Sequence, residues 1–279
     1  MLSHQQIEEF ANRGFLKGDV VLSEEEVERL QEELDRVLDN QSERKPVLAR
    51  NLLQSSSDYS SQMEISKEET VIQVVNIWMA SEPFFAHASR QRLCEEVAQL
   101  TGSDTLRIWH DQVQYKPPMT GGPTYWHQDH PAWPVLQPAD LVSAWVALDD
   151  ATIDNGCMWM VPHSHRWGDV GQSLQTDLET YTPYLLDSTL VPEGADITPV
   201  PFEIKRGQVG YHHCLMWHGA YPNRSDRKRR AIAVHYMPGH VRYVPTGGHV
   251  MEAFIHVLPG EVLAGEAFPV VYHRNGAIA

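Results

Sequence analysis

The chain has 279 residues and a formal net charge of −15, with 37 acidic residues against 22 Lys and Arg. Its hydrophobic fraction of 42% is ordinary for a globular protein and excludes global disorder, collagen and coiled-coil chains. The acidic balance argues against a nucleic-acid-binding protein, which needs clustered Lys and Arg to displace the counterions of the phosphates.

Targeting and redox features predict a cytoplasmic protein that does not enter a membrane. The longest apolar stretches, such as residues 141–148, are much shorter than the roughly 20 residues of a membrane span. The first ten residues lack the apolar segment of a secretory signal. Cys94, Cys157 and Cys214 are odd in number and far apart, which suits reduced thiols better than disulfides.

The first hundred residues predict helices that pack as a scaffold. Two capping-box patterns, each followed by apolar residues at helical spacing, mark helix starts at Ser3 with Gln6 and at Ser23 with Glu26. A third helix is predicted from about Pro83 to about Gly102. The Ser-rich stretch 55–62 predicts a surface loop, with a lid over a site as the alternative.

From residue 105 the pattern changes to short strands separated by Gly and Pro. The strand-like runs, rich in Val, Trp, Tyr and Ile, are 105–111, 141–148, 158–161, 209–217 and 231–236. Such strands without intervening helical repeats predict an antiparallel barrel or a double-sheet jelly roll. A stretch from about 166 to 201 interrupts them and receives no assignment. We therefore predict one domain over 1–279, helical at about 1–103 and a jelly-roll core at about 104–279.

The sharpest local feature is His127-Gln128-Asp129. In an extended chain His127 and Asp129 point to the same face, where an imidazole and a carboxylate make two ligands for a divalent metal. Two His and one carboxylate on one face are typical of non-haem Fe(II) oxygenases. Zinc takes the same ligand types, so the ligand set alone does not choose the metal.

A second His-rich strand offers three candidates for the third ligand: His212, His213 and His218. We choose His218, because it precedes Gly219 at the strand end, where loops form sites. We expect His212 and His213 in the core or behind the ligands.

A basic run, residues 223–230, leads into the last of these strands. The simplest interpretation is a solvated turn, since short charge runs usually face water. The functional alternative is that one Arg turns inward and binds the carboxylate of an acid through two hydrogen bonds.

Six stretches of the chain match one known family in the same order: 115–118 (Tyr-Lys-Pro-Pro), 126–129 (Trp-His-Gln-Asp), 144–150 (Ala-Trp-Val-Ala-Leu-Asp-Asp), 155–158 (Asn-Gly-Cys-Met), 162–165 (Pro-His-Ser-His) and 218–225 (His-Gly-Ala-Tyr-Pro-Asn-Arg-Ser). By these stretches the chain resembles the phytanoyl-CoA dioxygenase family of iron(II)- and 2-oxoglutarate-dependent oxygenases. The family usually has Pro-Gly-Ser-His where this chain has His163 in place of Gly. We expect His163 at the surface or behind the site, with a substrate contact as the alternative.

The resemblance implies a mainly β fold with flanking helices, a double-stranded β-helix of the cupin-like jelly-roll type. It also implies that His127, Asp129 and His218 hold Fe(II). In related halogenases a small residue replaces the carboxylate, so Asp129 favours hydroxylation, or another oxidation, over halogenation.

The resemblance also supplies the residues for the cosubstrate. Arg229, eleven residues after the distal His, would bind the far carboxylate of 2-oxoglutarate, with Arg227 and Arg230 as alternatives. Trp145 occupies the family position that lines the cosubstrate pocket, and Gln114 lies on a neighbouring strand. The reaction implied consumes O2 and converts 2-oxoglutarate to succinate and CO2 while a substrate is oxidised.

We expect a small-molecule substrate, because the net charge of −15 would repel the polyanionic coenzyme A. Trp126, His130 and Trp133 are candidates for the pocket wall, with core packing as the equal alternative for the two Trp. An aromatic rim would suit a hydrophobic or cationic natural product. The sequence does not give the oligomeric state.

Two other functions remain open at this point. One is a zinc-dependent jelly-roll hydrolase or isomerase in which His127, Asp129 and His218 activate water. The other is a non-catalytic binding module that keeps the pocket.

Overall fold

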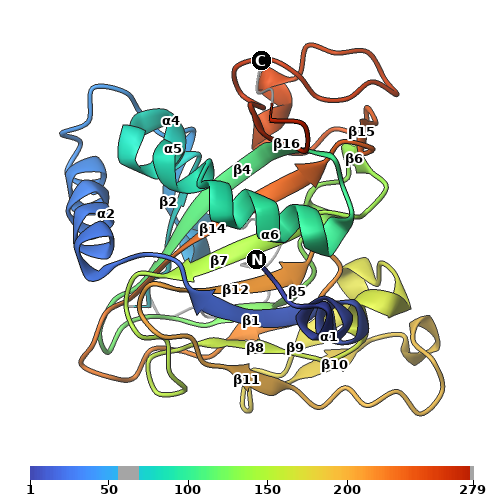
Figure 1. The fold of residues 1–279 in the computed structure, drawn as a ribbon. Helices are drawn as coiled ribbons and strands as arrows, with labels where there is room; N and C mark the ends of the chain where they lie inside the picture. The colour runs from blue at the N-terminus through green and yellow to red at the C-terminus, as the bar shows by residue number, and fades with distance from the viewer. Residues whose placement is uncertain (56–68, 277–279) are drawn as a thin grey trace.

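The computed structural model describes residues 1–55 and 69–276. Two antiparallel sheets form the centre of the fold, and helices cover the outer face of the larger sheet (Figure 1). The strands of the larger sheet run in the order β1 (Phe15–Val20), β12 (Gln208–His213), β7 (Val142–Ala147), β14 (Arg229–Pro238), β4 (Thr105–Lys116), β3 (Ile72–Val75) and β2 (Leu48–Asn51), and β16 (Val270–His273) also pairs with β4.

The smaller sheet covers the inner face of the larger one. Its strands run in the order β11 (Val200–Phe202), β8 (Met158–Met160), β13 (His218–Ala220) and β5 (Thr124–His127). Side chains of both sheets meet in one apolar cluster that includes Trp145, Ala231 and Ala233 from the larger sheet with Met158, Met160 and Phe202 from the smaller. The predicted double-sheet jelly roll is therefore confirmed.

Six α-helices are described: α1 (His4–Arg13), α2 (Glu24–Leu38), α3 (Leu52–Ser55), α4 (Ile77–Ala80), α5 (Glu82–Ala88) and α6 (Gln91–Thr101). Both predicted capping boxes are present, at Ser3 before α1 and at Ser23 before α2. Each cap satisfies backbone N–H groups that the first helical turn leaves unpaired. In the described part of the chain no helix is long and apolar enough to span a bilayer.

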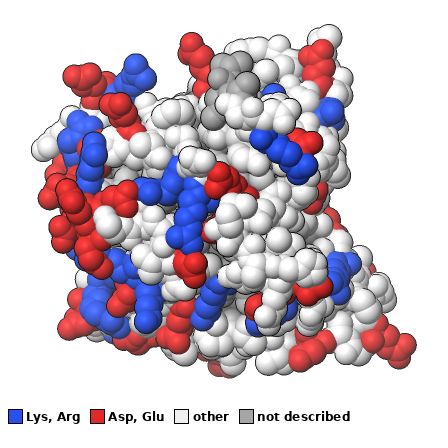
Figure 2. Space-filling model, in the orientation of Figure 1, with Lys and Arg blue, Asp and Glu red and all other residues white. Residues whose placement is uncertain are grey.

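Helix α2 shows how the helical layer divides between core and solvent. Its apolar stripe of Val27, Leu30, Leu34 and Val37 is buried in the cluster beneath the helices. Its first turn carries three Glu, which suit the positive end of the helix dipole. Acidic side chains gather over this helix, with basic ones among them (Figure 2).

The prediction of a helical segment over 1–103 was partly wrong. Strands β1, β2 and β3 come from this segment and extend the larger sheet at its two edges. Strand β1 pairs with β12, so its strand conformation depends on a partner almost 200 residues away that local patterns do not show. The polar loop predicted at 55–62 lies outside the described residues, except that Ser55 ends α3.

The single helix predicted from about Pro83 to about Gly102 is also wrong, because the structure divides it into α5 and α6. The break falls at Ser89 and Arg90, where the Arg90 backbone leaves the helical conformation with ψ at 120°. The Ser89 hydroxyl donates to the Phe85 carbonyl, and the Arg90 side chain pairs with Glu26 of α2. Neither Gly nor Pro marks this break in the sequence.

The stretch 166–201, which received no assignment, consists of short elements. They are η3 (Ser164–Trp167, whose first residues precede the stretch), η4 (Gly171–Ser173), β9 (Leu174–Thr176), β10 (Pro183–Leu185), η5 (Ser188–Leu190) and the start of β11. Strands β9 and β10 pair with each other, and the Thr176 hydroxyl accepts a hydrogen bond from the backbone of Trp126 in β5. Elsewhere, β6 (Leu136–Gln137) pairs with β15 (Arg242–Tyr243). The elements η2 (His130–Ala132) and η6 (Val250–Phe254), like the other η elements, are short 3-10 helices.

Strand β14 directs polar side chains into the space between the sheets. Ile232 and Val234 face the helices, whereas Ala231 and Ala233 face the smaller sheet. Because side chains alternate along a strand, Arg229 lies on the same inner face as Ala231. The alternation of side chains along this strand therefore places Arg229 between the two sheets.

Gly14 ends α1 with φ at +84°, a conformation that other residues adopt at a cost. A Cβ there would lie 2.4 Å from Nδ1 of His165 and 2.7 Å from Sδ of Met216, whereas Gly102, also at positive φ, has nothing within 4 Å. We expect Gly14→Ala to lower the free energy of unfolding by about 2–4 kcal/mol and Gly102→Ala by about 1 kcal/mol. Urea unfolding measures both, and equal losses would show that the contacts at Gly14 relax at no cost.

Candidate metal centre

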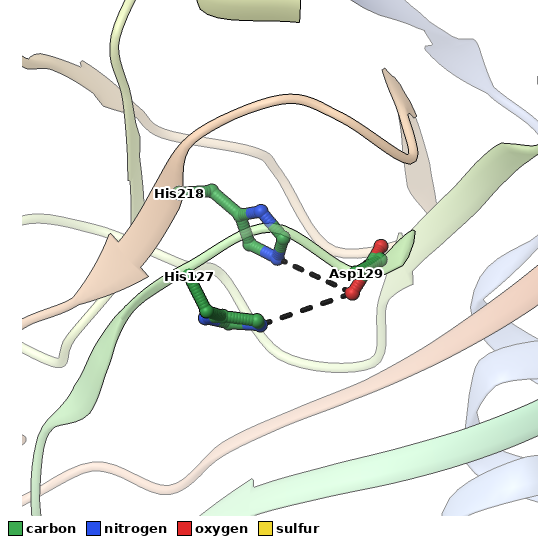
Figure 3. Close-up of side chains that lie close together, drawn as sticks. All are labelled: His127, Asp129 and His218. Carbon is green, nitrogen blue, oxygen red and sulfur yellow. Dashed lines mark ion pairs between the residues drawn. The ribbon is translucent and has the colours of Figure 1, made fainter. Parts of the chain in front are cut away.

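Three side chains converge where β5 and β13 lie side by side. His127 ends β5 and is paired in register with His218, which begins β13, and Asp129 follows two residues after His127. Oδ1 of Asp129 lies 3.8 Å from Nε2 of His127 and 3.7 Å from Nε2 of His218 (Figure 3). One potential ligand atom from each residue lies within 4.8 Å of the others, a spacing that can hold a metal ion.

Both imidazoles are oriented by the backbone. Nδ1 of His127 lies 2.7 Å from the Tyr125 carbonyl oxygen, and Nδ1 of His218 lies 2.9 Å from that of Met216. A carbonyl oxygen only accepts, so each Nδ1 carries a proton, and in the neutral form of each ring Nε2 presents a lone pair towards Asp129. Metal-binding His residues in proteins are commonly fixed in this way.

The two oxygens of the Asp129 carboxylate have different environments. Oδ2 lies 3.1 Å from Nε2 of His212 and 3.2 Å from the Ser143 hydroxyl, while Oδ1 faces the two ligand candidates. Burial alone would raise the pKa of Asp129, but His218 and the hydrogen bond from His212 hold it well below its usual range. Burial also lowers the pKa of His218 well below its usual value. A carboxylate and neutral imidazoles are the protonation states that a metal requires.

A cavity lies over the three converging side chains. Gln114 of β4 and Trp145 of β7, both predicted for the cosubstrate, line it together with Thr124 and Met158. The structure thus brings the predicted pocket residues and the three ligand candidates to one cavity.

Arg229 is fully buried beside this cavity. Its Nη1 lies 3.5 Å from the Gln114 carbonyl oxygen, and its guanidinium carbon lies 5.8 Å from the Trp145 ring centre. Nε and Nη2 are buried without a hydrogen-bond partner among the described residues, and burial lowers the pKa of Arg229 to about 10. A buried cation with free donors is costly unless an anion binds it, so this geometry suits a carboxylate ligand.

The two alternative arginines have other partners. Arg230 forms a bidentate ion pair with Asp149, at 2.9 Å for each bond. Arg227 lies at the surface, with its Nη2 2.8 Å from Asp154. Neither is therefore left with the free buried donors that Arg229 has.

Lys116 is a second buried basic residue beside Arg229, and it was not among the predicted site residues. It is fully buried opposite Arg229 in the sheet, and its Nζ donates to the carbonyl oxygens of Ala220 and Tyr221 at 3.2 and 2.8 Å. Burial, and next the charge of Arg229, lower the pKa of Lys116 well below its usual range. Strand alternation could have indicated Lys116, because it lies two residues after Gln114 and so shares a strand face with it.

The expected positions of His212 and His163 agree with the structure, but the pocket-wall candidates do not line the cavity. His212 is buried behind Asp129, and His163 is exposed beside the Asn12 carbonyl oxygen at the end of α1. Three candidates for the wall pack elsewhere: the Trp126 indole donates to the Tyr181 carbonyl, Trp133 packs on His235, and Nε2 of His130 contacts the Leu136 carbonyl. Core packing, the alternative for the two Trp, is correct.

Comparison with known proteins identifies relatives along most of the chain. The family model described as Phytanoyl-CoA dioxygenase (PhyH) matches residues 10–231. The peroxisomal phytanoyl-CoA dioxygenase of Rattus norvegicus is 22% identical over 265 residues, which cover 90% of this chain and 73% of that protein.

Solved structures show the same fold. The non-heme alpha ketoglutarate dependent carbocyclase SnoK from nogalamycin biosynthesis is 26% identical, with a TM-score of 0.74 and 96% of each chain covered. The epimerase SnoN, solved with Fe3+, alpha ketoglutarate and nogalamycin RO, has a TM-score of 0.73 at 23% identity, covering 96% of this chain and 97% of that one.

The resemblance expected from the sequence is therefore confirmed, and with it the requirement for Fe(II), 2-oxoglutarate and O2. The converging donors, and the two nitrogens of Arg229 that lack a partner among the described residues, suit this metal and this dicarboxylate. The chain belongs to the phytanoyl-CoA dioxygenase family, whose members are iron(II)- and 2-oxoglutarate-dependent oxygenases.

Proposed function

We propose that this enzyme hydroxylates, or otherwise oxidises, a small molecule while 2-oxoglutarate is converted to succinate and CO2. In this proposal His127, Asp129 and His218 hold Fe(II), and Arg229 binds the far carboxylate of 2-oxoglutarate. The observation that carries it is that three converging donors and a buried guanidinium, with two nitrogens that lack a partner in the described part of the chain, lie beside one cavity. Residues 1–279 act as one catalytic domain, to which the N-terminal strands contribute both sheet edges.

The iron supplies the oxidising chemistry when it is bound with its cosubstrate and O2. The chain supplies position and environment. The backbone carbonyls at Tyr125 and Met216 fix the His rings, and Gln114 and Trp145 form the cavity wall beside Arg229. A buried site of this kind also keeps water away from the reacting atoms.

A small-molecule substrate is favoured over a coenzyme A thioester. The net charge of −15 opposes a polyanion. Two structural neighbours, SnoK and SnoN, come from nogalamycin biosynthesis, which favours a natural-product substrate for this enzyme as well. The cavity combines Met158 with the polar Gln112 and Thr124, so a hydrophobic molecule with a polar group would suit it.

The two alternative functions find less support. A zinc-dependent hydrolase needs the three converging donors but has no use for the buried Arg229 beside them. A binding module without turnover would have no need to keep Arg229 buried with free donors.

Localisation in the cytoplasm is proposed because Cys94, Cys157 and Cys214 are free and buried.

The test is a turnover assay of metal-free protein reconstituted with Fe(II). With 2-oxoglutarate, ascorbate and a panel of hydrophobic and cationic natural products, we expect succinate formation that needs air and rises with the correct substrate. Mass spectrometry of the substrate should then show oxidation in a ratio of one to one with succinate. Turnover by zinc-loaded protein in air-free buffer without 2-oxoglutarate would refute the proposal.

A further inference from the structure

A row of polar side chains crosses the inner face of the larger sheet and ends at Asp129. It passes from strand to strand through β2, β3, β4, β14 and β7, and its members are Arg50, Gln73, Gln112, His235, Ser143 and Asp129. We name this row the Arg50–Asp129 relay. Each consecutive pair is joined by one hydrogen bond.

The direction of hydrogen-bond donation along the relay is set by Arg50. Arg50 donates from Nε to Oε1 of Gln73 at 2.8 Å, and a guanidinium has no acceptor, so the Gln73 amide group is fixed. Nε2 of Gln73 then donates to Oε1 of Gln112 at 2.5 Å. Nε2 of Gln112 is an amide nitrogen, which only donates, and it faces Nε2 of His235 at 3.1 Å.

His235 must therefore accept at Nε2. The residue is buried, which lowers its pKa to about 4, so the ring is neutral near pH 7 and its one proton lies on Nδ1. Nδ1 lies 2.6 Å from the Ser143 hydroxyl and donates to it. The Ser143 hydroxyl in turn donates a hydrogen bond to Oδ2 of Asp129 at 3.2 Å. The direction of donation thus runs from Arg50 to Asp129 without a conflict.

We propose that the Arg50–Asp129 relay orients the Asp129 carboxylate, so that Oδ2 is satisfied by the chain and Oδ1 is presented to the metal. Gln112, His235 and Ser143 are then positioning residues of the metal centre. His212 supplies a second donor to Oδ2 at 3.1 Å. An oxygen that accepts two hydrogen bonds is a poorer second ligand for a metal, which favours binding through Oδ1. The inference rests on the proposed function, since it takes Asp129 as a ligand.

The first test measures Co(II) binding to the metal-free protein by titration and visible absorption. Ser143→Ala should weaken Co(II) binding about 10-fold or more and change the Co(II) spectrum, as loss of partners behind a ligand usually does. Ser143→Thr keeps the hydroxyl and should lose much less Co(II) affinity than Ser143→Ala. Ser103→Ala is the matched control, since it removes a buried hydroxyl that donates to the Thr105 carbonyl.

The second test observes the proton on His235 directly. Nitrogen-15 spectra of His-labelled, metal-free protein should show His235 protonated at Nδ1, with its signal assigned by its loss in His235→Gln. Gln112→Glu has nearly the same shape but can only accept, so it should move the proton to Nε2. It should also weaken Co(II) binding, because Ser143 would then donate to His235.

The outcomes separate the two proposals. If Asp129→Ala binds Co(II) as wild type does, the proposed metal site is wrong. If Asp129→Ala loses Co(II) while Ser143→Ala and Gln112→Glu keep the wild-type affinity and spectrum, only the relay is refuted. A wild-type His235 protonated at Nε2 would refute it as well, whatever the metal affinities are.

Discussion

Replacing Asp129 with alanine is expected to abolish iron-dependent succinate formation and to weaken Fe(II) binding at least about 100-fold. The reason is that Oδ1 of Asp129 is the only carboxylate oxygen facing both Nε2 atoms of His127 and His218 in the described structure. Loss of residues behind a ligand typically costs 10- to 100-fold in affinity, and loss of the ligand itself should cost more. Metal binding is measured by titration and succinate by chromatography.

The fold should survive this change, which far-ultraviolet circular dichroism can check. Asp129→Asn serves as a second variant, because it removes the charge but leaves an acceptor for His212 and Ser143. Asp154→Ala removes a surface carboxylate paired with Arg227 and is the control. A folded Asp129→Ala protein with full iron-dependent activity would rule out Asp129 as a ligand.

Replacing Arg229 with glutamine is expected to raise the Kd for 2-oxoglutarate about 100-fold while Fe(II) binding stays unchanged. Arg229 is buried, and two of its donor nitrogens have no partner in residues 1–55 and 69–276, so a carboxylate there would gain charge-assisted hydrogen bonds worth about 1.5–3 kcal/mol each. Gln lacks the charge and the paired donors. Isothermal titration of the iron-loaded, air-free protein measures the affinity.

Two neighbouring arginines, Arg230 and Arg227, allow the same Arg-to-Gln change to be made as a matched control. Arg230→Gln breaks the ion pair with Asp149, and Arg227→Gln breaks the one with Asp154. Both should bind 2-oxoglutarate as wild type does, although Arg230→Gln should unfold at lower denaturant because it removes the half-buried ion pair with Asp149. If Arg230→Gln or Arg227→Gln weakened the affinity and Arg229→Gln did not, the proposed role of Arg229 would be wrong.

Residues that lie close in the sequence were the easiest to predict. The spacing of His127 and Asp129 is a local property, and it brings both side chains to one site although β5 ends at His127. Ser3 and Ser23 likewise satisfy groups within their own helices. The side of β14 on which Arg229 lies could also be predicted, because it follows from alternation with Ala231 and Ala233.

Residues whose conformation depends on distant partners could not be predicted from local patterns. Strand β1 forms against β12, and the break at Arg90 is associated with a contact to Glu26. The Arg50–Asp129 relay joins five strands that lie in five separate parts of the sequence, so no spacing reveals it. His235 was within reach, since it shares the inner face of β14 with Arg229.

The most direct measurement is an air-free visible absorption titration of the metal-free protein, first with Fe(II) and then with 2-oxoglutarate. We predict a weak charge-transfer band that needs both components, because the proposed site holds the iron through three side chains and leaves positions for the 2-oxo acid. The same titration of Arg229→Gln should need much more 2-oxoglutarate to reach the band. Iron that is bound without any such band would contradict the claim that this centre joins Fe(II) to 2-oxoglutarate.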